Sequence, residues 1–254
     1  MRLSPYRPHR AALGAAFEVE FPPNVEQWRL RLAAQGSDLP INFLLGWLKH
    51  ESGGNPCAVG IPGVEAGMFQ TYHPTDDRYG ATYSELRAGC SGSSIVNPAE
   101  INRDLQVKSG LNYVRSKRDA ARRHLAAVGA NWSESSSDFW SMVKQEHALP
   151  CVAVDLLPLV TTKLGRAPSS WSEFRSTAMT IPASSMSAGC ARFANSPSHR
   201  SLRSRLEDTL ANAEKVGAYG AGGGRGASGG SLLAALAIAG ILTLGSMAYL
   251  KGRS

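Results

Sequence analysis

The stretch "FLLGWLKHESGGNP", residues 43–56, places one glutamate, Glu51, at the end of an apolar run and follows it with glycines, an asparagine and a proline. The apolar residues recur at helical spacing, so we expect residues 40–52 to form an amphipathic helix that stops at Gly53. On that helix Glu51 lies about one turn beyond Leu48, at the edge of the apolar stripe. A carboxyl group in such a place is costly unless the protein uses it.

Burial against the apolar stripe disfavours the charged form of a carboxyl group. We therefore expect a raised pKa for Glu51, which would keep a proton available near neutral pH. A general acid that cleaves a glycosidic bond needs such a proton. An exposed glutamate at a fraying helix end fits this helix equally well when the helix is considered alone.

The remainder of the chain also has helical periodicity and lacks the alternation of strands, so the predicted fold class is mostly α. In "NPAE", Asn97 has the properties of an N-cap and Glu100 those of its capping-box partner, which predicts a long helix from there to about Gly129. The other helices are expected over residues 24–35, 136–147, 151–164, 170–178 and 199–216.

The two ends of the chain differ from this pattern. Residues 1–22 form an N-terminal arm that makes a poor signal peptide. Near the other end, "SLLAALAIAGILTLGSMAYL", residues 231–250, carries no charge and as a helix would span roughly 30 Å, which predicts a single transmembrane helix. A buried core helix is the alternative. The expected domains are the arm (1–22), a helical domain (23–190), a basic linker helix (191–216), a glycine-rich tether (217–230) and the membrane span (231–250).

The net charge of +7 comes mostly from the C-terminal part of the chain. Such a tail is attracted to any polyanion, whether lipid, nucleic acid or an acidic wall polymer. Nucleic-acid binding is not favoured, because the chain has no zinc-finger spacing and no RNA-binding signature. It stays open as a rival through the basic residues near Arg115 to Arg123 and around Arg203, although a solvated helix face explains the former as well.

Neither a metal nor another cofactor is predicted. The chain has four cysteines, and Cys57, Cys90, Cys151 and Cys190 form no C-x-x-C pair. Disulfides in an oxidising compartment and buried thiols both remain open. "HES", residues 50–52, lacks the second histidine of a zinc peptidase, and no glycine-rich phosphate loop follows a strand.

Further motifs shift the balance for Glu51 towards catalysis. "ESGGNP" is followed by "EAGMFQ", residues 65–70, and then by "NPAEINRDLQVKSGLNYVR", residues 97–115. In this order the motifs resemble those of the soluble lytic transglycosylase and goose-type lysozyme families, over roughly residues 25–150. The resemblance implies a lysozyme-like helical fold and cleavage of peptidoglycan glycan strands.

The resemblance also implies roles for individual residues. Glu51 would be the catalytic acid that protonates the glycosidic oxygen and then acts as the base. The substrate-binding residues that it implies are Ser52, Gly67, Met68, Phe69, Gln70 and Tyr113. Among these, Met68 and Phe69 fit the apolar core better than a substrate contact.

The chain departs from the family at its closing motif. In place of an alanine-rich helix that ends in Tyr-Asn-x-Gly, it has "FWSMVKQEHALPCVAV", residues 139–154, which resembles a phage-type variant that ends in Lys-x-x-His-x-x-Pro. His147 would then replace the missing tyrosine as a substrate contact, or it is simply a histidine at a helix end. Glu65 is the nearby candidate for a second carboxylate, with a structural role as the alternative.

These expectations combine into a membrane-anchored lytic transglycosylase, typical of a phage virion enzyme that opens the cell wall for genome delivery. Its partners would be glycan strands, a membrane through residues 231–250, and other virion or envelope proteins. It would lie in a virion membrane, or in a bacterial inner membrane with the catalytic domain facing the periplasm. The alternatives are a hydrolytic muramidase, which needs two carboxyl groups, and a non-catalytic, membrane-anchored glycan-binding protein.

Overall fold

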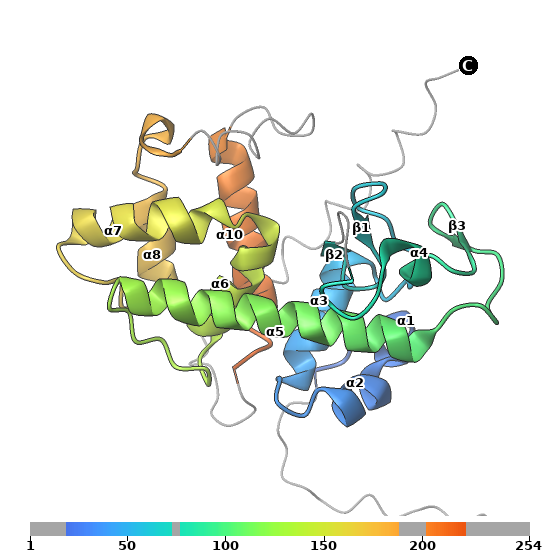
Figure 1. The fold of residues 1–254 in the computed structure, drawn as a ribbon. Coiled ribbons are helices and arrows are strands. Elements are labelled where there is room, and N and C mark those ends of the chain that lie inside the picture. Colours follow the sequence, from blue (N-terminus) through green and yellow to red (C-terminus); the bar gives the residue numbers. More distant parts are fainter. Residues whose placement is uncertain (1–18, 73–76, 188–201, 222–254) are drawn as a thin grey trace, which may run out of the picture. The chain divides into compact units, whose positions relative to one another are not determined.

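Helices dominate the computed structural model of this chain (Figure 1), which describes residues 19–72, 77–187 and 202–221. The helices are α1 (Pro23–Glu26), α2 (Arg29–Gln35), α3 (Ile41–Glu51), α4 (Tyr83–Leu86), α5 (Arg103–Ala127), α6 (Ser137–Ala148), α7 (Leu157–Leu164), α8 (Trp171–Ala178) and α10 (Leu202–Gly217), with a π-helical segment η1 (Val152–Leu156) and a 3-10 turn η2 (Ala183–Ser185). Strand β1 (Glu65–Ala66) pairs antiparallel with β2 (Thr71–Tyr72), and β3 (Cys90–Ser91) pairs with β4 (Ser94–Ile95). The predicted mostly α class is confirmed for the described residues.

Helix α3 forms as the sequence predicts. It begins directly after Pro40, buries every residue from Phe43 to Leu48 and ends at Glu51. The backbone N–H of Ser52 still bonds to the Leu48 carbonyl, but Gly53 then adopts a positive φ of 60°, which only glycine takes up without strain. The end of the helix, and with it the position of Glu51, is therefore set by the glycine that follows.

The core lies where α3, α5 and α6 meet. Phe43 and Trp47 of α3 are fully buried, and the Phe43 ring lies 4.7 Å from that of Trp140 on α6. Gly110 of α5 faces the Phe69 ring, and a Cβ on this glycine would collide with the ring. The backbone of α5 therefore approaches the turn that follows β1 at the one position where no side chain intervenes.

Helix α5 begins later than the sequence predicts. The Asn97 side chain does accept from Ala99 and donate to Glu100, but these residues form a turn, and the helix begins only when Asn102 caps the Leu105 N–H at 3.0 Å. The backbone N–H of Asn97 bonds to the carbonyl of Gly89, the residue before β3, so this turn is tied to the β3–β4 hairpin.

Several short elements were not predicted. The strands have only two residues each, too few for an alternating pattern to be recognised. The expected helix 24–35 is broken into α1 and α2, with Trp28 at the break, where its indole N–H donates to the Gly54 carbonyl at 2.8 Å. The expected helix 151–164 begins as the wider η1, because Pro158 near the start of α7 has no N–H to donate.

Helix α10 packs against the other helices, whereas the sequence predicts residues 191–216 as a linker helix outside the helical domain. Leu206, Leu210, Ala213 and Val216 form a buried stripe that packs on α6. At the end of α10 a Cβ on Gly217 would collide with Ser141, so the two backbones are in close contact. The described residues all belong to one compact unit that includes α10.

The predictions for the ends of the chain fall mostly outside the described residues. The membrane span 231–250, most of the tether 217–230 and nearly all of the arm 1–22 lie there. Within residues 19–72, 77–187 and 202–221, no helix combines the length and the apolar character needed to cross a bilayer.

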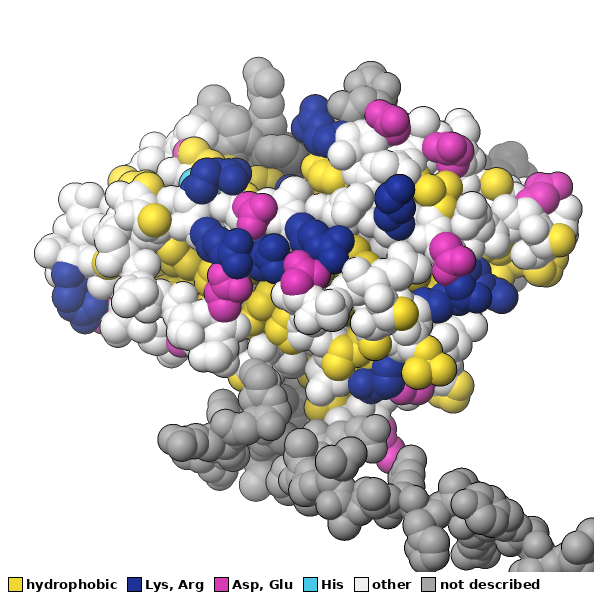
Figure 2. Space-filling view, turned by 60° about the horizontal axis from the view of Figure 1, so that its bottom comes forward, with side chains coloured by type: hydrophobic (Ala, Val, Ile, Leu, Met, Phe, Trp, Pro, Cys, Tyr) yellow, Lys and Arg dark blue, Asp and Glu magenta, His cyan; other side chains and the backbone are white. Residues whose placement is uncertain are grey.

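Three arginines of α5 form ion pairs with acidic residues. Arg115 and Arg118 both bind Asp38, at 2.6 and 3.0 Å, and Arg122 binds Asp119 at 3.0 Å. On the face that Figure 2 displays, basic side chains have acidic ones between them. This arrangement is typical of a solvent-exposed helix face on which ion pairs form.

Candidate active site

Two side chains of α6 contact the Glu51 carboxyl group. Lys144 Nζ donates to Glu51 Oε1, and His147 Nε2 lies 3.2 Å from the same oxygen. Lys144 and His147 are three positions apart, so they project from one face of α6 towards the end of α3. The Glu51 side chain keeps 16% of its exposure and Lys144 only 1%, so the carboxyl group is enclosed and the ammonium group is dry.

The pKa of Glu51 is shifted in the direction opposite to our expectation. Burial is the strongest influence and by itself raises the pKa of Glu51, as the sequence analysis argued. The positive charge of Lys144, followed by the contributions of His147, acts against burial and outweighs it, so the pKa of Glu51 lies well below its ordinary value. In the resting structure Glu51 is therefore a carboxylate, and the expectation of a raised pKa was wrong.

His147 is neutral and its hydrogen bonds have a defined direction. Burial, reinforced by the charge of Lys144, lowers the pKa of His147 to about 4. The Tyr113 hydroxyl lies 2.8 Å from Nδ1 of His147, and burial raises the pKa of Tyr113 well above its ordinary value, so this hydroxyl keeps its proton. A neutral imidazole carries one N–H, and the acceptor Glu51 faces Nε2, so the proton is on Nε2 and Tyr113 donates to Nδ1.

Trp47 forms an aromatic surface beside these groups. Lys144 Nζ lies 4.7 Å from the centre of the Trp47 ring, and the rings of Trp47 and His147 are 5.0 Å apart. The Trp47 indole N–H donates to the Phe69 carbonyl at 3.2 Å. Trp47 therefore supports the cation that binds Glu51 and joins α3 to the turn after β1.

Ser52 connects the first two motifs in space. Its hydroxyl donates to the Met68 carbonyl at 2.7 Å and accepts from the Gly54 N–H at 3.0 Å. Met68 and Phe69 themselves have no exposed surface, so their side chains belong to the core. The sequence favours this position over a substrate contact. The residue next to Glu51 thus holds the backbone of the "EAGMFQ" segment in place.

The turn between β1 and β2 has an unusual backbone. Gly67 has a φ of 80°, and Gln70 has a φ of 50°, the one positive value among the described residues other than glycine. The Gln70 side chain is buried, and its Nε2 donates to the Gly67 carbonyl at 2.7 Å. This side chain therefore stabilises the turn from inside.

Glu65 begins that turn and has the opposite electrostatic character to Glu51. Burial, followed by the negative charge of Glu51, raises the pKa of Glu65. Glu51 and Glu65, which interact electrostatically, thus have pKa values displaced in opposite directions, a pattern that is typical of acid–base sites.

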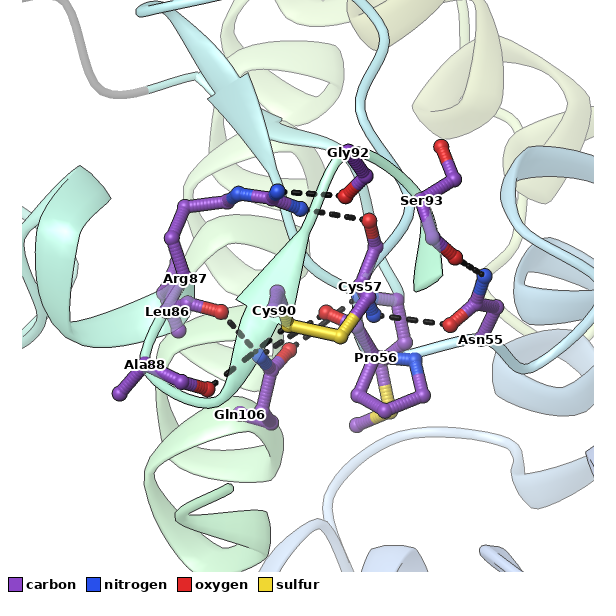
Figure 3. Close-up of a disulfide and its surroundings, with 11 residues drawn as sticks. Asn55, Pro56, Cys57, Leu86, Arg87, Ala88, Cys90, Gly92, Ser93 and Gln106 are labelled. Atoms are coloured by element: carbon purple, nitrogen blue, oxygen red, sulfur yellow. Dashed lines mark hydrogen bonds between the residues drawn. A yellow bond between two sulfur atoms is a disulfide. The ribbon is translucent and has the colours of Figure 1, made fainter. Parts of the chain in front are cut away.

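A disulfide and a glutamine fasten the segment that carries this turn (Figure 3). Cys57 is bonded to Cys90, 33 positions along the chain, and Arg87 donates to the Cys57 carbonyl at 2.6 Å. Gln106 of α5 donates to the Leu86 carbonyl at 2.8 Å and also binds the Pro56 carbonyl. Cys151 is also disulfide-bonded, so of the alternatives left open by the sequence, the described cysteines take the oxidised one.

The structure brings together Glu51, Tyr113 and His147, which the sequence singled out separately. It adds two residues that sequence reasoning missed, Lys144 and Trp47. The sequence does contain a pattern that could have indicated Lys144. In "KQEH", residues 144–147, this lysine lies one turn before His147 on an otherwise apolar helix face. Among the described residues, no group of three or more His, Cys, Asp or Glu side chains is arranged to hold a metal ion.

Comparison of the chain with protein-family models, with curated proteins and with solved structures gives no match.

Proposed function

We propose that this chain is a peptidoglycan lytic transglycosylase with a lysozyme-like helical domain, and that Glu51 is its reacting carboxyl group. The observation that carries the proposal is the enclosed Glu51 at the end of α3, bound by Lys144 and His147. Ser52 supports it, because its bond to Met68 joins in space two of the three motifs by which the chain resembles that family.

A purely structural role explains this arrangement poorly. Glu51 is the last residue of α3, where the negative end of the helix dipole disfavours a carboxylate. A buried ion pair contributes little net stability, because desolvation of both charges offsets their attraction. An apolar pair of similar volume would stabilise the fold as well, so the charges are better explained by chemistry at this site.

The proposed reaction uses one carboxyl group twice. Protonated Glu51 gives its proton to the glycosidic oxygen, and the bond between C1 of N-acetylmuramic acid and that oxygen breaks. The resulting carboxylate then takes the proton of the 6-hydroxyl of the same sugar while that oxygen bonds to C1. The products are a free N-acetylglucosamine 4-hydroxyl and a 1,6-anhydro ring, and Glu51 regains its proton, so no water is consumed.

Lys144 and His147 fit the half of this cycle in which Glu51 is ionised. When Glu51 releases its proton, negative charge develops on the oxygen that both residues contact. Their donors are already oriented, so they stabilise that charge without reorganisation and make Glu51 a stronger acid. The same contacts keep the resting carboxyl group ionised, so the reaction is expected to be faster in acidic solution, where more of Glu51 is protonated.

Hydrolysis is the second candidate, and the observation that favours it is Glu65. Its carboxyl group interacts electrostatically with Glu51, as expected for a pair of carboxyl groups on one site. A muramidase would use the second group as a base or a nucleophile. The product separates the candidates, because hydrolysis leaves a reducing end and transglycosylation leaves the anhydro ring.

The proposal extends to the setting of the enzyme. The apolar run 231–250 and the glycine-rich segment before it support a membrane anchor. Such an anchor beside a wall-cleaving domain is suited to a phage virion protein that opens the cell wall during genome delivery. An anchored bacterial envelope enzyme has the same architecture.

The test is digestion of purified peptidoglycan by the full chain in detergent, with the released muropeptides analysed by mass spectrometry. We expect 1,6-anhydro products from the wild type and none from Glu51→Gln. Glu134→Gln is the matched control, because it makes the same chemical change at an exposed ion pair with Arg122. Reducing-end products would identify a hydrolase. The absence of any product from the wild type would contradict the enzymatic proposal, and co-sedimentation with peptidoglycan would then test for a non-catalytic glycan-binding protein.

A further inference from the structure

The side-chain oxygen of Gln70 is buried without a hydrogen-bond partner. The Nε2 of this residue donates to Gly67, but its Oε1 has no hydrogen-bond partner although only 4% of the residue is exposed. An amide oxygen that is buried without a donor destabilises the folded state. Gln70 also holds a positive φ, so this turn carries two unfavourable features in one residue.

The Glu65 carboxyl group lies beside this oxygen of Gln70. A Cβ added to Gly60 would meet both Glu65 Oε2 and Gln70 Oε1, the latter at 2.6 Å, so the two oxygens converge on the same small space. Both are acceptors when Glu65 is ionised, and two acceptors that face each other repel. A proton on Glu65 removes the repulsion and supplies the donor that Gln70 lacks.

The charges around Glu65 are consistent with this proton. Burial and the negative charge of Glu51 raise the pKa of Glu65. A hydrogen bond from the Ile61 backbone, followed by the charges of Lys144 on α6 and Arg205 on α10, acts in the opposite direction and does not outweigh them. Tyr113 on α5 also faces Glu65, and it stays neutral itself. The net effect on the pKa of Glu65 is upward, the direction that the geometry requires.

We propose that Glu65 is an uncharged carboxylic acid whose O–H donates to Gln70 Oε1, and that it positions the Gly67–Gln70 turn instead of activating water. Ser52 bonds to this turn at Met68, so the position of the turn is linked to the residue beside Glu51. The proposal rests on the proposed function in one consequence only. A carboxyl group that keeps its proton cannot accept one from water, so Glu65 would not be the second carboxylate that a hydrolase needs.

Glu65→Gln is the decisive variant, because a carboxamide can present an N–H where the acid presents its O–H. We expect this variant to release 1,6-anhydro products at a rate within about threefold of the wild type. Glu65→Leu, of similar size and without a donor, should lower the rate at least tenfold. A loss of a hundredfold or more in Glu65→Gln would overturn the proposal, because it would show that the ionised carboxylate is needed.

Two further measurements do not depend on catalysis. The infrared spectrum of the folded wild type at pH 7 should contain the C=O band of a protonated carboxylic acid that is absent from Glu65→Gln. A raised pKa in the folded state also means that the contribution of Glu65 to stability is present below its unfolded pKa and is lost as the pH rises through its folded value. The melting temperature of the wild type should therefore fall relative to that of Glu65→Gln over that range.

These readouts separate the two proposals. If the band and the pH dependence appear but no peptidoglycan is cleaved, the proposed function fails and the protonated Glu65 stands. If 1,6-anhydro products form but the two proteins have the same carboxylic-acid band and the same pH dependence, the inference about Glu65 fails and the enzyme stands.

Discussion

Lys144 on α6 binds Glu51 on α3 across 93 positions of sequence, and this contact reverses the charge state that the sequence around Glu51 predicts. An apolar helix face alone raises the pKa of a carboxyl group. A buried ammonium group in contact with it lowers that pKa further than burial raises it. The chemistry of Glu51 therefore depends on α6 as much as on its own helix.

Lys144→Met tests this relationship. Removal of the positive charge leaves burial as the main influence, so the pKa of Glu51 should rise and the upper limit of the active pH range should move to higher pH. The maximal rate should fall about a hundredfold, because one donor to the developing carboxylate is lost. The measurement is kcat/KM against pH on soluble peptidoglycan fragments.

Lys163→Met is the control for Lys144→Met. It makes the same change on α7, where the Lys163 ammonium group donates to Thr180 at an exposed position. This variant should keep the pH profile of the wild type. If the two variants have the same profile, the pair between Lys144 and Glu51 does not control the acid.

His147 predicts a second pH dependence, this time of stability. Its pKa is about 4 in the folded protein against 6.5 for an ordinary histidine, so the unfolded chain binds the proton more tightly. The stability contributed by neutral His147 is therefore complete above pH 6.5 and declines as the pH falls towards 4, by up to about 3 kcal/mol.

Denaturant unfolding between pH 4 and pH 8 measures this contribution. The free energy of unfolding of His147→Gln should change less over the acidic half of that range than that of the wild type, because glutamine takes up no proton. His124→Gln on α5 is a useful comparison, since this histidine is partly exposed and is bound to Glu146. Equal slopes in the wild type and His147→Gln would contradict the neutral, buried state of His147.

The sequence predicts best those helices whose ends are set by residues close to them in the chain. Helix α3 was correctly placed because an apolar period, a proline before it and a glycine after it all act within a few residues. Helices α6 and α8 begin within one residue of their predicted starts, because Ser136 and Ser170 cap them as their residue type favours.

The failures have distant causes. Asn97 and Asn102 are both suitable N-caps, and residue type alone does not choose between them. The charge state of Glu51 was mispredicted because Lys144 lies on another helix, 93 positions away in the sequence. Tyr113 and His147 were each singled out, but only the fold reveals that one orients the other.

The disulfide predicts sensitivity to reduction. It closes a loop of 33 residues that contains the turn from Gly67 to Gln70, and such a loop closure stabilises a fold by about 3–4 kcal/mol. The double variant Cys57→Ala/Cys90→Ala should lose about that amount and should lose activity at temperatures where α5 and α6 remain folded. Circular dichroism and the release of muropeptides, recorded over the same temperatures, would show whether activity is lost before helicity. Simultaneous loss of both would mean that the disulfide supports the whole domain and not this loop in particular.

Leu210 tests whether α10 unfolds together with α6 and the rest of the described core. This residue is completely buried in the stripe by which α10 packs on α6, the helix that carries Lys144 and His147. Leu210→Ala should destabilise the protein by about 2–5 kcal/mol in a single cooperative transition, because a cavity opens in a shared core. Glu207→Ala, at an exposed position of the same helix, should change the stability by less than about 0.5 kcal/mol. If Leu210→Ala unfolds α10 in a separate early step and leaves the main transition unchanged, α10 is an independent segment, and Lys144 and His147 hold Glu51 without its support.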